Sequence, residues 1–219
     1  MENKLDNFSF ANEKEIARSF SKRFQWEMVL IGLGQALVFF SLWPLVILDF
    51  ITLSIGAPIS TLCALMAYLP SHEAQHGNYS RGNPNRRWID SLVSHVSLIT
   101  LMFPHHVMRA THMKHHAYTN DPQKDVDYDV ASSKSLLEVL KDDKNFVKSF
   151  EKGALVGLSY RGSLLALVFF FPLEALFLWW LPSKIGVLYL STFFSWYPHY
   201  QMDIGRYKDT RFWHHLLPR

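Results

Sequence analysis

The sequence predicts an all-α integral membrane protein, because it holds two long uncharged runs, two later apolar runs and a polar middle segment rich in histidine. The run from Met28 to Leu48 carries no charged residue over 21 positions. At about 1.5 Å rise per residue, such a helix is long enough to cross a hydrocarbon core of about 30 Å. Only Asp49 and Phe50 separate it from a second uncharged run, Ile51 to Pro70. We therefore expect a first transmembrane helical hairpin.

A second hairpin is expected further along the chain. Ser163 to Leu181 and Ile185 to Tyr197 are apolar, and Pro182-Ser183-Lys184 separates them. The two hairpins together give about four spans. A soluble helical protein with an apolar core is the alternative, but an uncharged run of this length is typical of a membrane span.

The distribution of basic residues predicts the orientation. Arginine and lysine gather before the first run and in the middle segment, whereas the two hairpin turns hold only Lys184. The positive-inside rule then places both termini and the middle segment in the cytoplasm, as expected for a protein of a bacterial inner membrane. These basic residues suit contact with the lipid bilayer, and no helix-turn-helix or aromatic RNA-binding signature points to nucleic acid.

The chain is expected to form one domain, residues 1–219, with the chemistry in a cytoplasmic middle segment, residues 71–153. Inside this segment we expect a loop at 80–85, an interfacial helix at 91–103 and an amphipathic helix at 133–150. A further helix is expected at 13–24.

Histidine spacing is the main indication of function. Eight of the eleven histidines lie between His72 and His116. His72 and His76 are four residues apart, and His112, His115 and His116 fall within five positions, so each group can share one face of a helix. Neutral imidazole is a common ligand for iron, zinc and copper. The sequence therefore predicts a metal site on the cytoplasmic side of the spans.

Two other interpretations remain open. His72-Glu73-Ala74-Gln75-His76 matches the H-E-x-x-H pattern of zinc peptidases, with Glu73 as the general base. That interpretation gives no role to His112, His115 and His116, which suit a site with two metals. The third possibility is a membrane protein that binds metal without catalysis.

Neighbouring residues are assigned by the same reasoning. Asp121, Asp125 and Asp127 follow the second histidine group and can accept the other ring N–H of a ligating imidazole. His95, His105 and His106 are expected at the headgroup level rather than as ligands. The one cysteine, Cys63, excludes a disulfide within the sequence, a cysteine-ligated iron–sulfur cluster and a C-x-x-C-H haem attachment, so electrons must come from another protein.

At these residues the chain resembles the membrane fatty acid desaturase and hydroxylase superfamily, whose pattern is a hairpin, H-x(3–4)-H, H-x-x-H-H, a second hairpin and a third H-x-x-H-H box. The closer likeness is to the bacterial carotenoid (beta-carotene) hydroxylase branch. It rests on His112-x-x-His115-His116-Ala117-x-Thr119-Asn120-Asp121-Pro122, on Asp125-Val126-Asp127, on Pro198-His199 and on Arg206-Tyr207 with Asp209-Thr210-Arg211.

The resemblance implies an O2-dependent hydroxylase or desaturase with two non-haem iron ions and an external electron donor such as a ferredoxin or cytochrome. Its implied metal ligands are His72, His76, His112, His115, His116 and His199. The implied substrate is lipid-soluble: carotenoid ring hydroxylation is favoured, and fatty acyl desaturation in lipid metabolism is the alternative.

The third box is missing from its expected place. Arg211-Phe212-Trp213-His214-His215-Leu216-Leu217-Pro218 imitates it, with arginine at the position of the first histidine. The resemblance therefore leads us to expect a C-terminally truncated chain whose third box lies beyond Arg219 and whose activity alone is doubtful.

Overall fold

The computed structural model describes residues 24–119, 121, 123–125, 135, 137–138 and 154–197. Over these residues the regular structure is entirely helical, as the sequence predicts. Several sequence predictions fall outside the described residues: the helix at 13–24 except its last residue, most of the helix at 133–150, Asp127, His199, His214 and His215.

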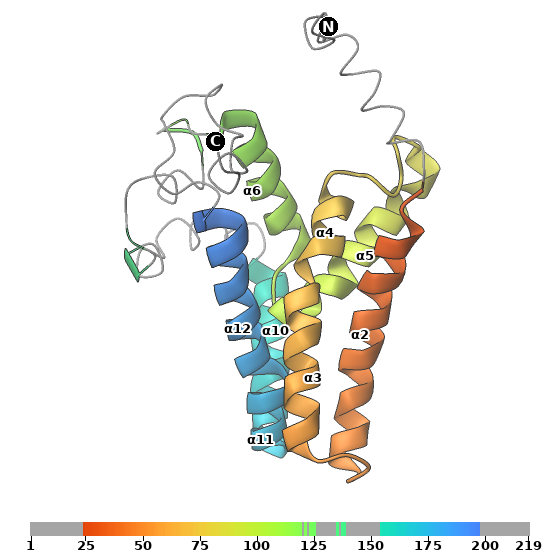
Figure 1. Ribbon diagram of the computed structural model, residues 1–219, viewed down its shortest axis with the longest axis vertical. Coiled ribbons are helices and arrows are strands. Elements are labelled where there is room, and N and C mark those ends of the chain that lie inside the picture. Colours follow the sequence, from red (N-terminus) through yellow and green to blue (C-terminus); the bar gives the residue numbers. More distant parts are fainter. Residues whose placement is uncertain are drawn as a thin grey trace, which may run out of the picture.

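The first two apolar runs form neighbouring helices joined by a short turn. Helix α2 spans Trp26–Ile47, α3 spans Leu53–Met66, and α4, Tyr68–Gln75, continues from α3. Asp49 sits in the turn at a φ of 59°. In Figure 1, α2 and α3 stand side by side, and α4 extends beyond α3 at the end of the bundle opposite the turn. The turn and the first histidine pair therefore lie at opposite ends.

The two later apolar runs, 163–181 and 185–197, form helices whose boundary differs from the predicted one. Helix α10 covers Ala154–Phe170, and a continuous helical stretch of 25 residues, Pro172–Trp196, follows. This stretch comprises α11 (Pro172–Glu174), the π-helix η4 (Ala175–Trp180), α12 (Leu181–Leu190) and the π-helix η5 (Ser191–Trp196). The break predicted at residues 182–184 is therefore wrong, and the chain turns at Phe171 instead.

Local backbone chemistry explains the difference. Phe171 leaves the helical conformation, with φ −139° and ψ 69°, and the following proline disfavours the α region at this position. Pro182 cannot donate to the carbonyl of Leu178 four residues earlier, which normally ends or kinks a helix. Here the wider π-turns precede the proline, and the Ser60 hydroxyl of α3 donates to the Leu178 carbonyl. The carbonyl is satisfied, so the helix continues.

Three helical stretches among the described residues are long and apolar enough to cross a membrane: Trp26–Ile47, Leu53–Gln75 and Pro172–Trp196. The sequence predicted about four; α10 is apolar but shorter than these three. Many large apolar side chains on these helices face outward, and Phe169, for example, is 82% exposed. Lipid is the solvent in which such a surface is favourable, so the protein is a membrane protein.

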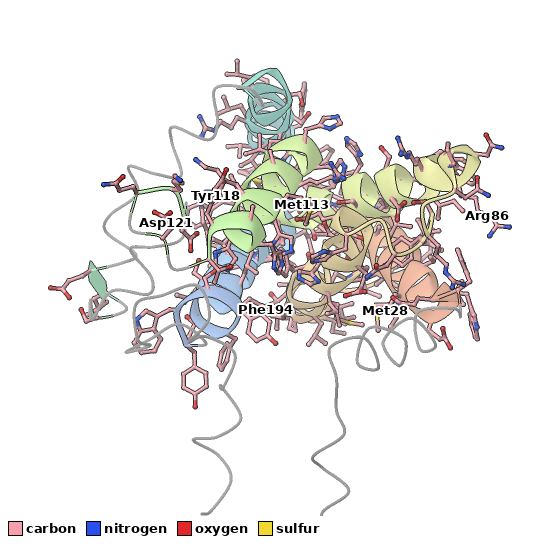
Figure 2. The ribbon with its side chains drawn as sticks, turned by 90° about the horizontal axis from the view of Figure 1, so that it is seen from above. Met28, Arg86, Met113, Tyr118, Asp121 and Phe194 are labelled. Carbon is pink, nitrogen blue, oxygen red and sulfur yellow. The ribbon has the colours of Figure 1, made fainter. Side chains whose placement is uncertain are left out.

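Two further helices cover the α4 end of the bundle. Helix α5, Arg87–Leu98, begins earlier than the predicted interfacial helix and continues through the 3-10 turn η2, Ile99–Leu101. Helix α6, His105–Tyr118, begins directly after Pro104. Figure 2 looks down on this end and shows α6 running from Tyr118 past Met113, with Phe194 to one side and Arg86 at the far edge of the molecule.

A glycine permits the close approach that fixes α4 beside α5. A Cβ at Gly32 of α2 would lie 2.9 Å from Pro70 Cβ of α4 and 2.9 Å from Val93 Cγ1 of α5. Small residues at such crossings let helix backbones come together within a membrane. The three helices therefore meet at Gly32, just below the first histidine pair.

Candidate metal centre

Four imidazoles from two helices converge at the end of the bundle that the sequence predicts to face the cytoplasm. His72 and His76 lie one turn apart on α4, and His112 and His116 lie one turn apart on α6. Each of these residues offers a ring nitrogen, and the four nitrogens all lie within 4.8 Å of one another. The structure thus brings together four of the six predicted ligands, which we call the first histidine cluster.

The nitrogen spacing suits a bound metal ion. Nε2 of His112 lies 2.9 Å from Nε2 of His76 and 3.1 Å from Nε2 of His116. Two imidazole nitrogens bound at about 2.1 Å to one ion lie about 3 Å apart when their bonds meet at a right angle. An all-imidazole set of this kind fits iron, zinc or copper.

Burial favours the neutral form of two of these rings. The pKa of His112 is lowered to about 3, first by burial and then, in order, by the nearby imidazoles of His72, His116, His76 and His115. Burial likewise lowers the pKa of His76, with smaller contributions from His72 and from Arg109. Both rings therefore present lone pairs at neutral pH, as metal binding requires.

The end of α4 fixes the position of His76. Gly77 adopts a left-handed φ of 73°, its N–H donates to Ala74 O at 3.0 Å, and the Asn78 N–H donates to Glu73 O at 3.1 Å. This is a Schellman motif, in which glycine takes the left-handed position without steric cost. Helix α4 therefore stops immediately after His76.

A buried carboxylate holds the loop that follows. Asp90 of α5 is 8% exposed and accepts the backbone N–H groups of Tyr79 and Ser80 at 3.0 and 3.1 Å. The Tyr79 hydroxyl in turn donates to Pro70 O at 2.8 Å, next to the start of the histidine motif. Nothing local in the sequence distinguishes Asp90 from a solvated acidic residue, so this role could not be predicted.

We expect Asp90→Ala to cost about 2–4 kcal/mol of stability, because it leaves two buried backbone N–H groups without their charged acceptor. Thermal unfolding in detergent measures this. The variant Asp49→Asn, in the exposed turn at the other end, is the control and should change the unfolding temperature little, because asparagine tolerates the left-handed backbone there. Equal stability of the two variants would contradict the role given to Asp90.

The two histidine-bearing helices are joined by an arginine. Arg109 lies one turn before His112, and its Nε donates to Gln75 O at 3.1 Å, the residue just before His76. This bond ties α6 to the last turn of α4. Sequence spacing could not have identified it, because the two residues are 34 positions apart.

Glu73 is engaged by its neighbours. Its Oε1 lies 3.2 Å from His72 Nδ1, and its Oε2 accepts from Asn78 Nδ2 at 2.6 Å. A carboxylate beside Nδ1 of a ligating imidazole fixes the tautomer and leaves the lone pair on Nε2. The contacts therefore suit a residue that orients His72.

His115 points its Nδ1 to Asp125. The Nδ1–Oδ1 distance is 2.9 Å, and the Asp125 side chain is 1% exposed. Asp121, predicted beside it, accepts instead the backbone N–H groups of Gln123 and Lys124, at 2.9 and 3.2 Å. Asp121 thus shapes the turn that brings Asp125 back to α6. The predicted sixth ligand, His199, and Asp127 lie outside the described residues.

Comparison with known proteins supports the histidine pattern. Residues 50–146, which contain both histidine groups, match the family model for fatty acid desaturase. Over these residues the chain is similar to the fatty acid desaturase family. It is also similar to three proteins described as sn-1 oleoyl-lipid 12-desaturase.

The relative from Picosynechococcus sp. is 29% identical over 130 residues, which are 59% of this chain and 29% of the relative. The one from Anabaena variabilis is 29% identical over 98 residues, 45% of this chain and 25% of the relative. The one from Synechocystis sp. is 28% identical over 104 residues, 48% of this chain and 28% of the relative. The matched part of the chain thus spans less than a third of each relative's length.

No solved structure matches the chain significantly. The relatives also bear on which substrate is expected, a carotenoid or a fatty acyl chain. They are named as acyl-lipid desaturases, so the comparisons do not support the carotenoid hydroxylase branch that the second histidine group favoured, and the acyl alternative fits them better.

Proposed function

We propose that this chain is an O2-dependent, non-haem diiron oxidoreductase that introduces a double bond into the acyl chain of a membrane lipid. The observation that carries the proposal is the convergence of four imidazoles from α4 and α6 at the end of apolar, membrane-length helices, in a chain that is similar to fatty acid desaturases. A lipid substrate is already dissolved in the bilayer, so a site at the membrane face meets it without extracting it.

The residues divide into those that would hold metal and those that would orient them. His72, His76, His112 and His116 would hold one ion, and His115 together with His199 would contribute to the second. Glu73 and Asp125 would hold the Nδ1 protons of His72 and His115, so that each ring presents Nε2. When bound, iron would supply the activation of O2. The overall reaction would take one hydrogen from each of two adjacent carbons, two electrons from an external donor and two protons, and would yield the double bond and two molecules of water.

The expected surroundings follow from the same proposal. The site would face the cytoplasm of a bacterial inner membrane, where a ferredoxin or cytochrome can deliver the electrons. Cys63 is the one cysteine of the sequence and is buried in α3, so this sequence has no cysteine set for an iron–sulfur cluster. The proposal therefore assigns the electrons to a partner protein of this kind.

A membrane zinc peptidase is less well supported. It requires Glu73 as a general base acting on a metal-bound water. Both Glu73 oxygens already contact His72 and Asn78, and the second histidine pair of the cluster would have no function.

Fatty acid analysis tests the proposal. The chain is expressed in cells whose lipids carry oleoyl groups, and their fatty acid methyl esters are separated by gas chromatography and mass spectrometry. We expect a new acyl chain with one more double bond, formed only in the presence of O2 and absent for His112→Ala. Glu73→Gln should retain some desaturation, whereas it would abolish a peptidase. Unchanged acyl chains together with hydroxylated carotenoids in carotene-producing cells would overturn the acyl assignment.

A further inference from the structure

Three histidines outside the first cluster also come together. His95 lies on α5, and His105 and His106 are the first two residues of α6. The ring centroids of His95 lie 4.6 Å from His105 and 5.0 Å from His106, and those of His105 and His106 lie 5.2 Å apart. Neighbouring rings of the first cluster are separated by similar distances, for example 4.8 Å between His72 and His76. We call these three residues the second histidine cluster.

Two of the three rings are held from their Nδ1 side. Nδ1 of His95 lies 2.7 Å from the carbonyl oxygen of Ser91. A carbonyl can only accept, so Nδ1 carries the proton and the lone pair of His95 is on Nε2. A ligating histidine characteristically donates its other N–H to a backbone carbonyl in this way.

His105 is anchored by a buried chain of polar groups. Its Nδ1 bonds to the hydroxyl of Ser94, which lies 2.7 Å from the hydroxyl of Ser71. Ser71 in turn accepts from Nε2 of Gln75 at 3.0 Å. Because Nδ1 of His105 is engaged in this chain, Nε2 is the nitrogen left to bind a ligand.

Burial favours the neutral form of His105, whereas His106 is open to solvent. His105 is 6% exposed, and burial lowers its pKa to about 4, with smaller contributions from His95, His106 and Arg109. His106 is exposed, so its ring can rotate to complete a set around a common point. Neutral imidazole is the form that binds metal.

We propose that His95, His105 and His106 form a second metal site, which takes a zinc-like divalent transition ion and joins the start of α6 to α5. Three imidazoles without a carboxylate suit zinc or copper rather than magnesium, calcium or manganese. His105 and His112 are seven residues apart on one helix, about 10 Å along its axis. This exceeds the roughly 4 Å between the ions of a two-metal centre, so the second site is separate from the first.

Zinc binding to the purified full-length chain in detergent tests the proposal. The chain is stripped of metal with a chelator and titrated with Zn²⁺ alone, and bound zinc and thermal unfolding are both measured. In the background His76→Ala/His112→Ala, which disables the first cluster, we expect about one equivalent of zinc to bind and to raise the unfolding temperature. Adding His106→Ala should weaken this binding by more than tenfold, and adding His95→Ala should do the same.

The control is Lys114→Ala, an exposed position on α6 that should leave zinc binding unchanged. His106 is also exposed, so its replacement should not alter unfolding in the absence of metal, and that measurement separates lost binding from lost folding. Absence of bound zinc in the first-cluster background would overturn the proposal, and so would equal affinity with and without His95 and His106. Neither outcome bears on desaturation, which depends on the first cluster.

Discussion

His112→Ala is expected to abolish iron binding at the first cluster and, with it, desaturation. The His112 ring lies 4.6 Å from that of His72, 4.8 Å from that of His76 and 4.5 Å from that of His116, so it contacts every other member of the cluster. Loss of a group that only orients a ligand already lowers metal affinity by about 10–100-fold, so loss of this central ligand should lower it by more than about a hundredfold.

Iron content of the purified protein, measured by elemental analysis, checks this result. Lys114→Ala lies two residues away on the exposed side of α6 and should keep its iron. Because His112 is partly buried, thermal unfolding without metal is also measured for both variants. Similar unfolding temperatures show that the lost iron does not reflect lost folding. Full iron content in His112→Ala would rule out the first cluster as the metal centre.

Asp125→Ala is expected to lower metal affinity or activity by about 10–100-fold while leaving all the histidines in place. The carboxylate is 1% exposed and lies 2.9 Å from His115 Nδ1. Without it the ring loses the acceptor that fixes its tautomer, and Nε2 no longer points in one direction. Asp125→Asn should be less harmful, because the amide oxygen can still accept the Nδ1 proton.

The matched control is Gln123→Ala, an exposed side chain in the same turn. Iron content and acyl product are measured for all three variants under the same conditions. The expected order of activity is Gln123→Ala, then Asp125→Asn, then Asp125→Ala. If Asp125→Ala equals Gln123→Ala, the carboxylate does not act through His115.

Much of the fold could be predicted because the signals are local. An uncharged run of membrane length specifies a spanning helix wherever it occurs, and α2 and α3 begin and end close to the predicted bounds. The prediction was wrong at Pro182, where the local rule that proline breaks a helix is overridden by a distant residue. Ser60 lies 118 positions from Leu178, whose carbonyl it satisfies, and no local pattern reveals that pairing.

The candidate site divides in the same way. The sequence by itself determined that His72 pairs with His76 and that His112 shares a helix face with His115 and His116, because four residues make about one helical turn. The structure places His116 in the cluster and His115 against Asp125. Only the tertiary structure decided that the histidines of α4 and α6 face each other, with Arg109 of α6 donating a hydrogen bond to the Gln75 carbonyl of α4. It also decided that His95 meets His105 and His106 across two helices. The physical reason is that ligand spacing within a helix follows from backbone geometry, whereas convergence between helices follows from packing and from hydrogen bonds between residues far apart in the chain.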